Sequence, residues 1–146
     1  PLAIVTSTGR AGAHRKLGLA GIARAFTHVV TLDDVRAPKP DPEPYLLAAT
    51  LFGVAPARCL VFEDSETGAE AAHRAGCTVV QVPDVVPSQG RWAHHLAPDL
   101  LTGARMARHT SSPDMPGIRI SRMMASKGAS SINDIACLPL PACSTS

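Results

Sequence analysis

The amino-acid sequence predicts an α/β fold built on a doubly wound parallel sheet, similar to a Rossmann core. Three observations lead to this prediction: short apolar segments rich in Val and Ile, helical segments between them, and Gly, Pro or polar residues at the boundaries. The apolar segments show little alternation of apolar and polar residues, which is typical of parallel strands buried on both faces. The alternation of strand and helix predicts right-handed crossover connections.

Four segments fit the description of buried strands. They are residues 2–6 (LAIVT), 28–32 (HVVTL), 59–62 (CLVF) and 78–82 (TVVQV). Functional groups of a parallel α/β sheet gather at the carboxyl ends of its strands. The residues that follow each segment are therefore the first candidates for chemistry.

Helices are expected between these strands. The first expected helix covers residues 10–17 and stops at Gly18. Another covers residues 66–75, with Ser65 as a cap at its start and Gly76 as its stop. Both have the small or polar boundary residues that mark helix ends in a sequence.

The clearest helical pattern covers residues 42–52. Asp41 can cap this helix, and Pro42 suits its first turn. Tyr45 belongs to its apolar face, and Gly53 directly after it is a typical helix end. The loop that leads into this helix delivers Lys39 between two prolines, which stiffens the backbone there.

Composition places limits on the class of protein. With 146 residues, 45% of them apolar and 18% charged, the chain can form one globular domain. The net charge of +2 is too small to indicate a nucleic-acid partner. The sequence contains no signal peptide and no apolar run of about 18 residues. We therefore expect no membrane partner and a cytoplasmic, reducing location, while the oligomeric state stays open.

The composition changes near Gly103. Every aromatic residue precedes position 93, and every Met follows position 105. Residues 1–103 are predicted to form the core domain, whereas residues 104–146 are rich in Ser and are predicted to be an irregular, mostly disordered tail. The run INDIACL within this tail could pair weakly. Because the chain opens with Pro1 and enters a strand at once, we also expect it to be truncated at its N-terminus.

Hydroxyl groups follow the first expected strand. Thr6 and Ser7 stand at its carboxyl end, directly before the helix that starts at residue 10. Hydroxyls together with the free amides of a helix N-terminus form a site for phosphate. An ordinary helix cap explains the same pattern and is, for this segment alone, the simpler interpretation.

A lysine and an acidic pair follow next. Lys39 can neutralise a phosphoryl oxygen or a carboxylate, although a single loop lysine is more often solvated. Glu63 and Asp64 follow the third strand, and adjacent carboxylates repel each other unless a cation lies between them. Mg²⁺ prefers oxygen ligands and often takes only one or two carboxylates from protein. Glu66 is better explained by solvent or by the helix dipole, and Gly68 with the neighbouring alanines would let the helix pack closely on the sheet.

Taken together, these segments resemble the haloacid dehalogenase (HAD) superfamily of hydrolases, and within it the β-phosphoglucomutase-like phosphatases. IVTST is similar to the second motif of the family, with Thr6 in the phosphate-binding position. KPDPEPYLLAATLFGVAP is similar to the third motif, with Lys39 as the catalytic, phosphate-binding lysine. CLVFEDSETGAEAAHRAG is similar to the fourth motif, with Glu63 and Asp64 in the magnesium-binding positions.

The resemblance covers roughly residues 1–85 and implies Mg²⁺-dependent phosphoryl transfer through an aspartyl-phosphate, on a small phosphorylated metabolite. The first motif of the family, D-x-D-G-T, is absent from these 146 residues, since LDDVR (32–36) lacks the spacing. The substrate-selecting cap and the central strand of the family are absent with it. The strands at 2–6 and 59–62 are then expected to leave a gap or to pair directly.

Three hypotheses follow from this pattern. The first is a HAD-type phosphatase or phosphomutase in an N-terminally truncated form. The second is a catalytically inactive fragment or splice product that acts, if at all, as a binding module. The third is an unrelated phosphate- or nucleotide-binding α/β module, which leaves Lys39 and the acidic pair unexplained.

Overall fold

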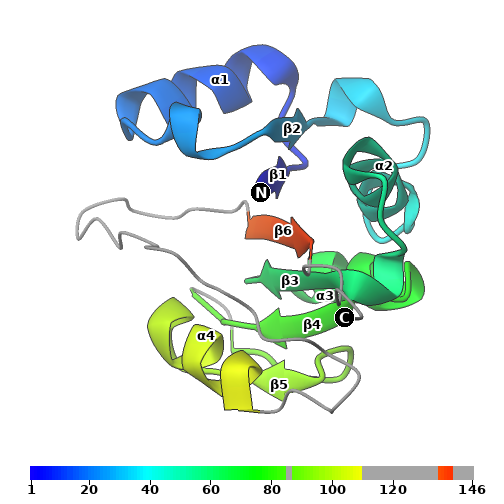
Figure 1. Ribbon diagram of the computed structural model, residues 1–146, viewed down its shortest axis with the longest axis vertical. Helices are drawn as coiled ribbons and strands as arrows, with labels where there is room; N and C mark the ends of the chain where they lie inside the picture. Colours follow the sequence, from blue (N-terminus) through cyan, green and yellow to red (C-terminus); the bar gives the residue numbers. More distant parts are fainter. Residues whose placement is uncertain (85–86, 110–134, 140–146) are drawn as a thin grey trace, which may run out of the picture.

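The computed structural model describes residues 1–84, 87–109 and 135–139, which form a single sheet flanked by helices (Figure 1). Six strands make up the sheet in the order β2-β1-β6-β3-β4-β5. Their bounds are β1 Ala3–Val5, β2 His28–Val30, β3 Cys59–Glu63, β4 Thr78–Gln81, β5 His95–Leu96 and β6 Ile135–Pro139.

Four α-helices and three short 3₁₀ turns connect or follow these strands. The α-helices are α1 Arg10–Leu19, α2 Glu43–Phe52, α3 Glu66–Arg74 and α4 Leu100–His109. The 3₁₀ turns are η1 Ala23–Ala25, η2 Leu32–Asp34 and η3 Pro56–Arg58. All four predicted strands and all three predicted helices are confirmed, with ends that differ by at most two residues.

Local signals account for several of the helix ends. Ser65 caps α3 by accepting a hydrogen bond from the Gly68 N–H at 3.1 Å. Asp41 accepts one from the Glu43 N–H at 2.9 Å at the start of α2. Gly53 ends α2 in the left-handed conformation, with φ of 64°. Helix α1 continues one residue past Gly18, so that glycine does not stop it as predicted.

Neighbouring strands among the four predicted ones pair in parallel, as the sequence predicts, while the added strand β6 is antiparallel to both strands beside it. β1 pairs in parallel with β2, and β4 lies in parallel between β3 and β5. β6 pairs antiparallel with both β1 and β3 and lies between them. The prediction that β1 and β3 leave a gap or pair directly is therefore wrong.

The segment predicted to be an irregular tail contains regular structure where it is described. Helix α4 runs across position 104, and β6 lies well inside the segment. The prediction underestimated INDIACL because a strand with little local signal gains its stability from its neighbours, and two open strand edges here supply hydrogen-bond partners. Residues 110–134 and 140–146 lie outside the described part of the chain.

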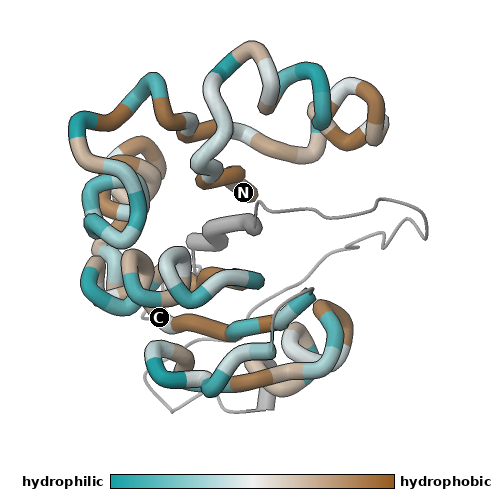
Figure 2. Tube along the Cα trace, turned by 180° about the vertical axis from the view of Figure 1, so that it is seen from behind, coloured by the Kyte–Doolittle hydropathy of each residue, from teal (hydrophilic) through white to brown (hydrophobic). Residues whose placement is uncertain are grey.

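Two layers of side chains cover the two faces of the sheet. Val61 on β3 belongs to the layer beneath α2 and α3, whereas its neighbours Leu60 and Phe62 belong to the layer beneath α4. Side chains of successive strand residues point to opposite faces, so a strand buried on both sides must be apolar throughout. Figure 2 shows hydrophobic segments along the strands and hydrophilic stretches on the outer turns. This is the doubly wound arrangement that the sequence predicts.

Candidate functional site

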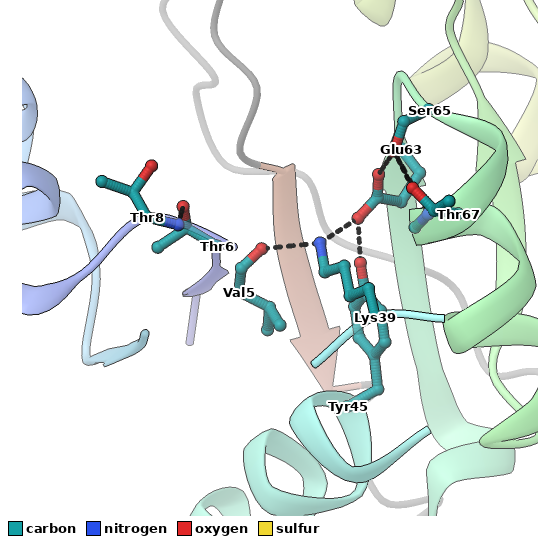
Figure 3. Close-up of polar contacts among 9 residues, drawn as sticks. Val5, Thr6, Thr8, Lys39, Tyr45, Glu63, Ser65 and Thr67 are labelled. Atoms are coloured by element: carbon teal, nitrogen blue, oxygen red, sulfur yellow. Dashed lines mark hydrogen bonds and ion pairs between the residues drawn. The ribbon is translucent and has the colours of Figure 1, made fainter. Parts of the chain in front are cut away.

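A buried ion pair lies at the carboxyl-end edge of the sheet. Nζ of Lys39 is 2.5 Å from Oε1 of Glu63, and the two side chains are 7% and 2% exposed. Lys39 comes from the loop before α2, while Glu63 is the last residue of β3 (Figure 3). Because each charge has lost most of its water, each depends on the other for stabilisation.

The same ammonium group reaches across the sheet to β1. Nζ of Lys39 donates a hydrogen bond to the backbone carbonyl of Val5 at 3.0 Å. Val5 ends β1 and directly precedes Thr6. Lys39 therefore joins the end of β1 to the end of β3, which are the two places where the sequence predicts functional groups (Figure 3).

Three further groups fix the carboxylate of Glu63. The hydroxyl of Tyr45, a fully buried residue on α2, donates to Oε1 of Glu63. The hydroxyl of Ser65 donates to Oε2 at 3.3 Å. Gly68 on α3 lies against the same carboxylate, so closely that a Cβ atom at this position would collide with it. The Lys39 ammonium also lies 5.0 Å from the centre of the Tyr45 ring, which places it in cation–π range.

The hydroxyls after β1 form a tight turn beside this pair. Thr6 is 4% exposed, and its Oγ1 accepts a hydrogen bond from the Thr8 N–H at 2.9 Å. Ser7 is exposed. Thr6 is therefore a buried hydroxyl within a turn, and Ser7 is at the surface next to it.

An acidic side chain occupies the start of α1, where the sequence predicts amides for phosphate. The Arg10 N–H donates to Oδ2 of Asp33 at 2.8 Å, and the Arg10 guanidinium pairs with Asp34 at 2.5 Å. Hydrogen bonds from Thr31 and the positive charge of Arg10 lower the pKa of Asp34, with the Thr31 hydroxyl as the largest cause. The structure thus shows that this helix start can hold a negative group.

The described acidic residues can offer Mg²⁺ only a small donor set. Within residues 1–84, 87–109 and 135–139, no three His, Cys, Asp or Glu side chains converge as a metal site. Asp64 is half-buried next to Glu63, whose two oxygens already accept hydrogen bonds. This set fits Mg²⁺ in the form in which the ion keeps several waters and takes one or two carboxylates.

Other polar residues gather near the start of α3. The Ser88 hydroxyl donates to Oε1 of Glu66, and Nε2 of Gln81 lies 3.5 Å from the same oxygen. Glu66 is therefore bound to its neighbours, rather than simply solvated as its position in the sequence suggests. Sequence reasoning also missed the role of Tyr45, because helix periodicity indicates a buried face but not the atom that a hydroxyl meets.

Comparison with known proteins places the chain among related hydrolases. A sequence profile of the haloacid dehalogenase-like hydrolase family matches residues 1–82. The chain is 40% identical over 82 residues to the fructose-1-phosphate phosphatase YqaB of Escherichia coli, a match that covers 56% of this chain and 44% of that protein.

Two solved structures have a similar fold. A protein from Thermotoga maritima, provisionally named a β-phosphoglucomutase, superposes with a TM-score of 0.60 at 35% identity, over 65% of this chain and 46% of that one. A HAD phosphatase from Thermococcus onnurineus superposes with a TM-score of 0.66 at 28% identity, over 72% of this chain and 49% of that one. In all three comparisons the chain spans less than half the length of the protein that it matches.

Proposed function

The chain belongs to the haloacid dehalogenase-like hydrolases, and from that premise we propose that its described residues form the phosphate- and Mg²⁺-binding side of a phosphatase. The substrate class would be a small phosphorylated metabolite; the E. coli relative is named for a sugar phosphate. One observation carries the proposal. A buried ammonium joins the strand end that bears Thr6 to the strand end that bears Glu63 and Asp64.

Lys39 would act as the catalytic lysine. An ammonium group has three N–H donors. The Glu63 carboxylate and the Val5 carbonyl accept two of them. A phosphoryl oxygen at the sheet edge is a suitable acceptor for a third, and the low exposure of the Lys39 side chain would strengthen that contact.

Thr6 and Ser7 would hold the phosphate from the other side. A hydroxyl can donate one hydrogen bond and accept others. Oγ1 of Thr6 already accepts one from the Thr8 N–H, which fixes its position, so its own O–H suits a phosphoryl oxygen. Ser7 is exposed beside it and could supply a further donor.

Asp64 and Glu63 would be the protein ligands of Mg²⁺, and Glu63 would at the same time hold the Lys39 ammonium. The bound ion would neutralise charge on the phosphoryl group. Cys59 and Cys77 are buried thiols without a disulfide, which suits a reducing location such as the cytoplasm.

The covalent step would need an aspartate nucleophile of the D-x-D-G-T type, which the 146 residues do not contain. We therefore assign phosphoryl transfer to a protein that combines this part with that motif. The second candidate function is a binding module without turnover. It is favoured by β6, which fills the centre of the sheet in the chain as it stands.

An assay on p-nitrophenyl phosphate with Mg²⁺ tests the proposal. We would compare the 146-residue chain with a version that carries an N-terminal D-x-D-G-T strand. The extended version should gain turnover. Asp64→Ala within that version should lower the turnover rate by roughly 10²-fold or more. No gain from the extension, or no loss with Asp64→Ala, would exclude the phosphatase assignment.

A further inference from the structure

β6 connects two parts of the sheet, and among the described strands it alone lies between them. On one side it pairs with β1, with Ile135 opposite Val5 and Cys137 opposite Ala3. On its other side it pairs with β3, with Cys137 also opposite Val61. The pair β2-β1 and the trio β3-β4-β5 are thus joined through this one strand (Figure 1).

The candidate site spans the same junction. Nζ of Lys39 contacts the Val5 carbonyl at the end of β1 and the Glu63 carboxylate at the end of β3. Neighbouring strands lie about 4.8 Å apart, so two strands with a third between them lie about 10 Å apart. The Lys39 side chain spans this wider spacing, because β6 begins between the Val5 carbonyl and the Glu63 carboxylate that its ammonium contacts (Figure 3).

Without β6 the edges of β1 and β3 would have two alternatives. They could leave their backbone N–H and C=O groups unpaired in the middle of the fold, which is costly. They could instead close up and pair directly, which would halve the distance between Val5 and Glu63. Neither arrangement keeps the two acceptors of Lys39 where the structure has them.

We propose that the C-terminal strand β6 is the positioning element of the Lys39–Glu63 site: it sets the separation of β1 and β3 on which the site depends. The inference deepens the proposed function and rests on it for what the site does. β6 itself contributes no reacting group in this proposal. Its role is to hold two strand ends at the distance that one ammonium group can bridge.

Disulfide trapping in the full-length chain tests the register directly. Directly paired residues of an antiparallel ladder share one face of the sheet, so a cysteine at position 3 comes into disulfide range of Cys137 only in this register. Ile4→Cys is the matched control, since residue 4 projects to the opposite face and pairs with Ala136. After mild oxidation by a disulfide such as oxidised glutathione, peptide mapping would quantify the bond to Cys137.

Ala3→Cys should form this bond in about tenfold larger yield than Ile4→Cys, because disulfide geometry tolerates little misplacement. The bonded form should also keep the Tyr45 emission of the unmodified chain. Equal yields at the two positions, or no bond from position 3, would overturn the proposal. This measurement requires neither phosphate nor Mg²⁺, so its failure is distinguishable from failure of the phosphatase assignment.

A second measurement tests the effect on the site. The chain has one Tyr and one Trp, and the Tyr45 hydroxyl donates to Glu63. A carboxylate that accepts a hydrogen bond from a tyrosine hydroxyl quenches the emission of that tyrosine. The intensity of Tyr45 emission therefore reports whether the site is assembled. Ala136→Pro removes an N–H from the centre of β6, whereas Ala136→Val keeps it and serves as the control.

Tyr45 emission should rise several-fold in Ala136→Pro and stay unchanged in Ala136→Val. A simultaneous change in Trp92 emission would mean that β6 holds the whole sheet, which supports the proposal as well. Unchanged Tyr45 emission in Ala136→Pro would overturn it, whether or not the protein hydrolyses phosphate esters. A site that assembles without β6 cannot depend on that strand for its spacing.

Discussion

Gly68 on α3 lies directly against the carboxylate of Glu63, where a Cβ atom on the helix would collide with this buried charge. The small residues Ala69, Ala71 and Ala72 are fully buried along the same helix. The helix can therefore approach β3 closely enough for the Ser65 hydroxyl to reach Glu63. The small residues of α3 therefore account both for its close packing on β3 and for the fixed position of the Glu63 carboxylate.

Gly68→Ala should destabilise the fold and disturb the ion pair. The added methyl group would occupy space that the Glu63 carboxylate already fills. Overpacking of this kind typically costs about 1–3 kcal/mol of unfolding free energy. Denaturant unfolding would measure the loss, and Tyr45 emission would show whether Glu63 has moved.

Gly18→Ala is the matched control for this substitution. Gly18 lies within α1, and apart from its chain neighbours and the helix backbone a Cβ atom there would meet no atom within 4 Å. Alanine is favoured over glycine in a helix by up to about 1 kcal/mol, so this variant should be as stable as the original or more stable. A Gly68→Ala variant as stable as the Gly18→Ala control would contradict the close packing of α3 on Glu63.

Tyr45→Phe should weaken the site while leaving the core filled. The substitution removes one hydroxyl that donates to Glu63 and keeps the aromatic ring that lies near Lys39. Hydrogen bonds to charged groups contribute about 1.5–3 kcal/mol. Unfolding free energy should fall by an amount in that range, as measured by urea titration. A stability equal to that of the original chain would show that the hydroxyl does not hold Glu63.

Sequence reasoning located most of this arrangement because its signals are local. Strand-end position made Thr6, Glu63 and Asp64 candidates, the stiff loop before α2 added Lys39, and the family resemblance joined them into one site. Parallel strands bring such residues to one edge, and the structure confirms that Lys39 and Glu63 meet there. The metal-binding role of Glu63 and Asp64 stays a prediction.

The features that sequence reasoning missed depend on contacts between distant segments. β6 has little signal of its own, and only the two open edges of β1 and β3 decide where it pairs and in which direction. The contact of Asp33 with the start of α1 joins residues 23 positions apart. Periodicity can assign a face to a residue, but it cannot name the atom on the other side.

Lys39→Met should destabilise the fold more than Gly68→Ala or Tyr45→Phe. It leaves the Glu63 carboxylate buried, with its positive partner removed. Breaking a buried pair from one side typically costs about 3–5 kcal/mol of unfolding free energy. Lys16→Met, at an exposed lysine on α1, is the control and should change stability little.

The double variant Lys39→Met/Glu63→Gln separates the charge effect from packing. Neutralising Glu63 removes the uncompensated charge, so the double variant should be more stable than Lys39→Met alone. Urea unfolding of all four members of this cycle gives the coupling free energy. Additive losses in the cycle would mean that Lys39 and Glu63 do not stabilise each other.

Stability should fall as the pH drops through the mid-acidic range, and His94 should contribute to the fall. Partial burial lowers the pKa of His94 from its ordinary value of 6.5, and the charges of His73 and His95 lower it further. Nδ1 of His94 accepts a hydrogen bond from the Val79 N–H at 3.0 Å, which requires that nitrogen to be unprotonated. Because the unfolded chain takes up this proton more readily than the folded chain, the contribution of His94 is present above pH 6.5 and is lost below it.

Replacing His94 with Asn isolates this contribution, since the Asn side-chain oxygen can accept the Val79 N–H without titrating in this range. Urea unfolding between pH 5 and 8 should show a shallower fall in stability for His94→Asn than for the original chain. His14→Asn, at an exposed histidine on α1 away from this contact, should retain the original slope. If all three proteins gave the same slope, protonation of His94 would not be linked to folding.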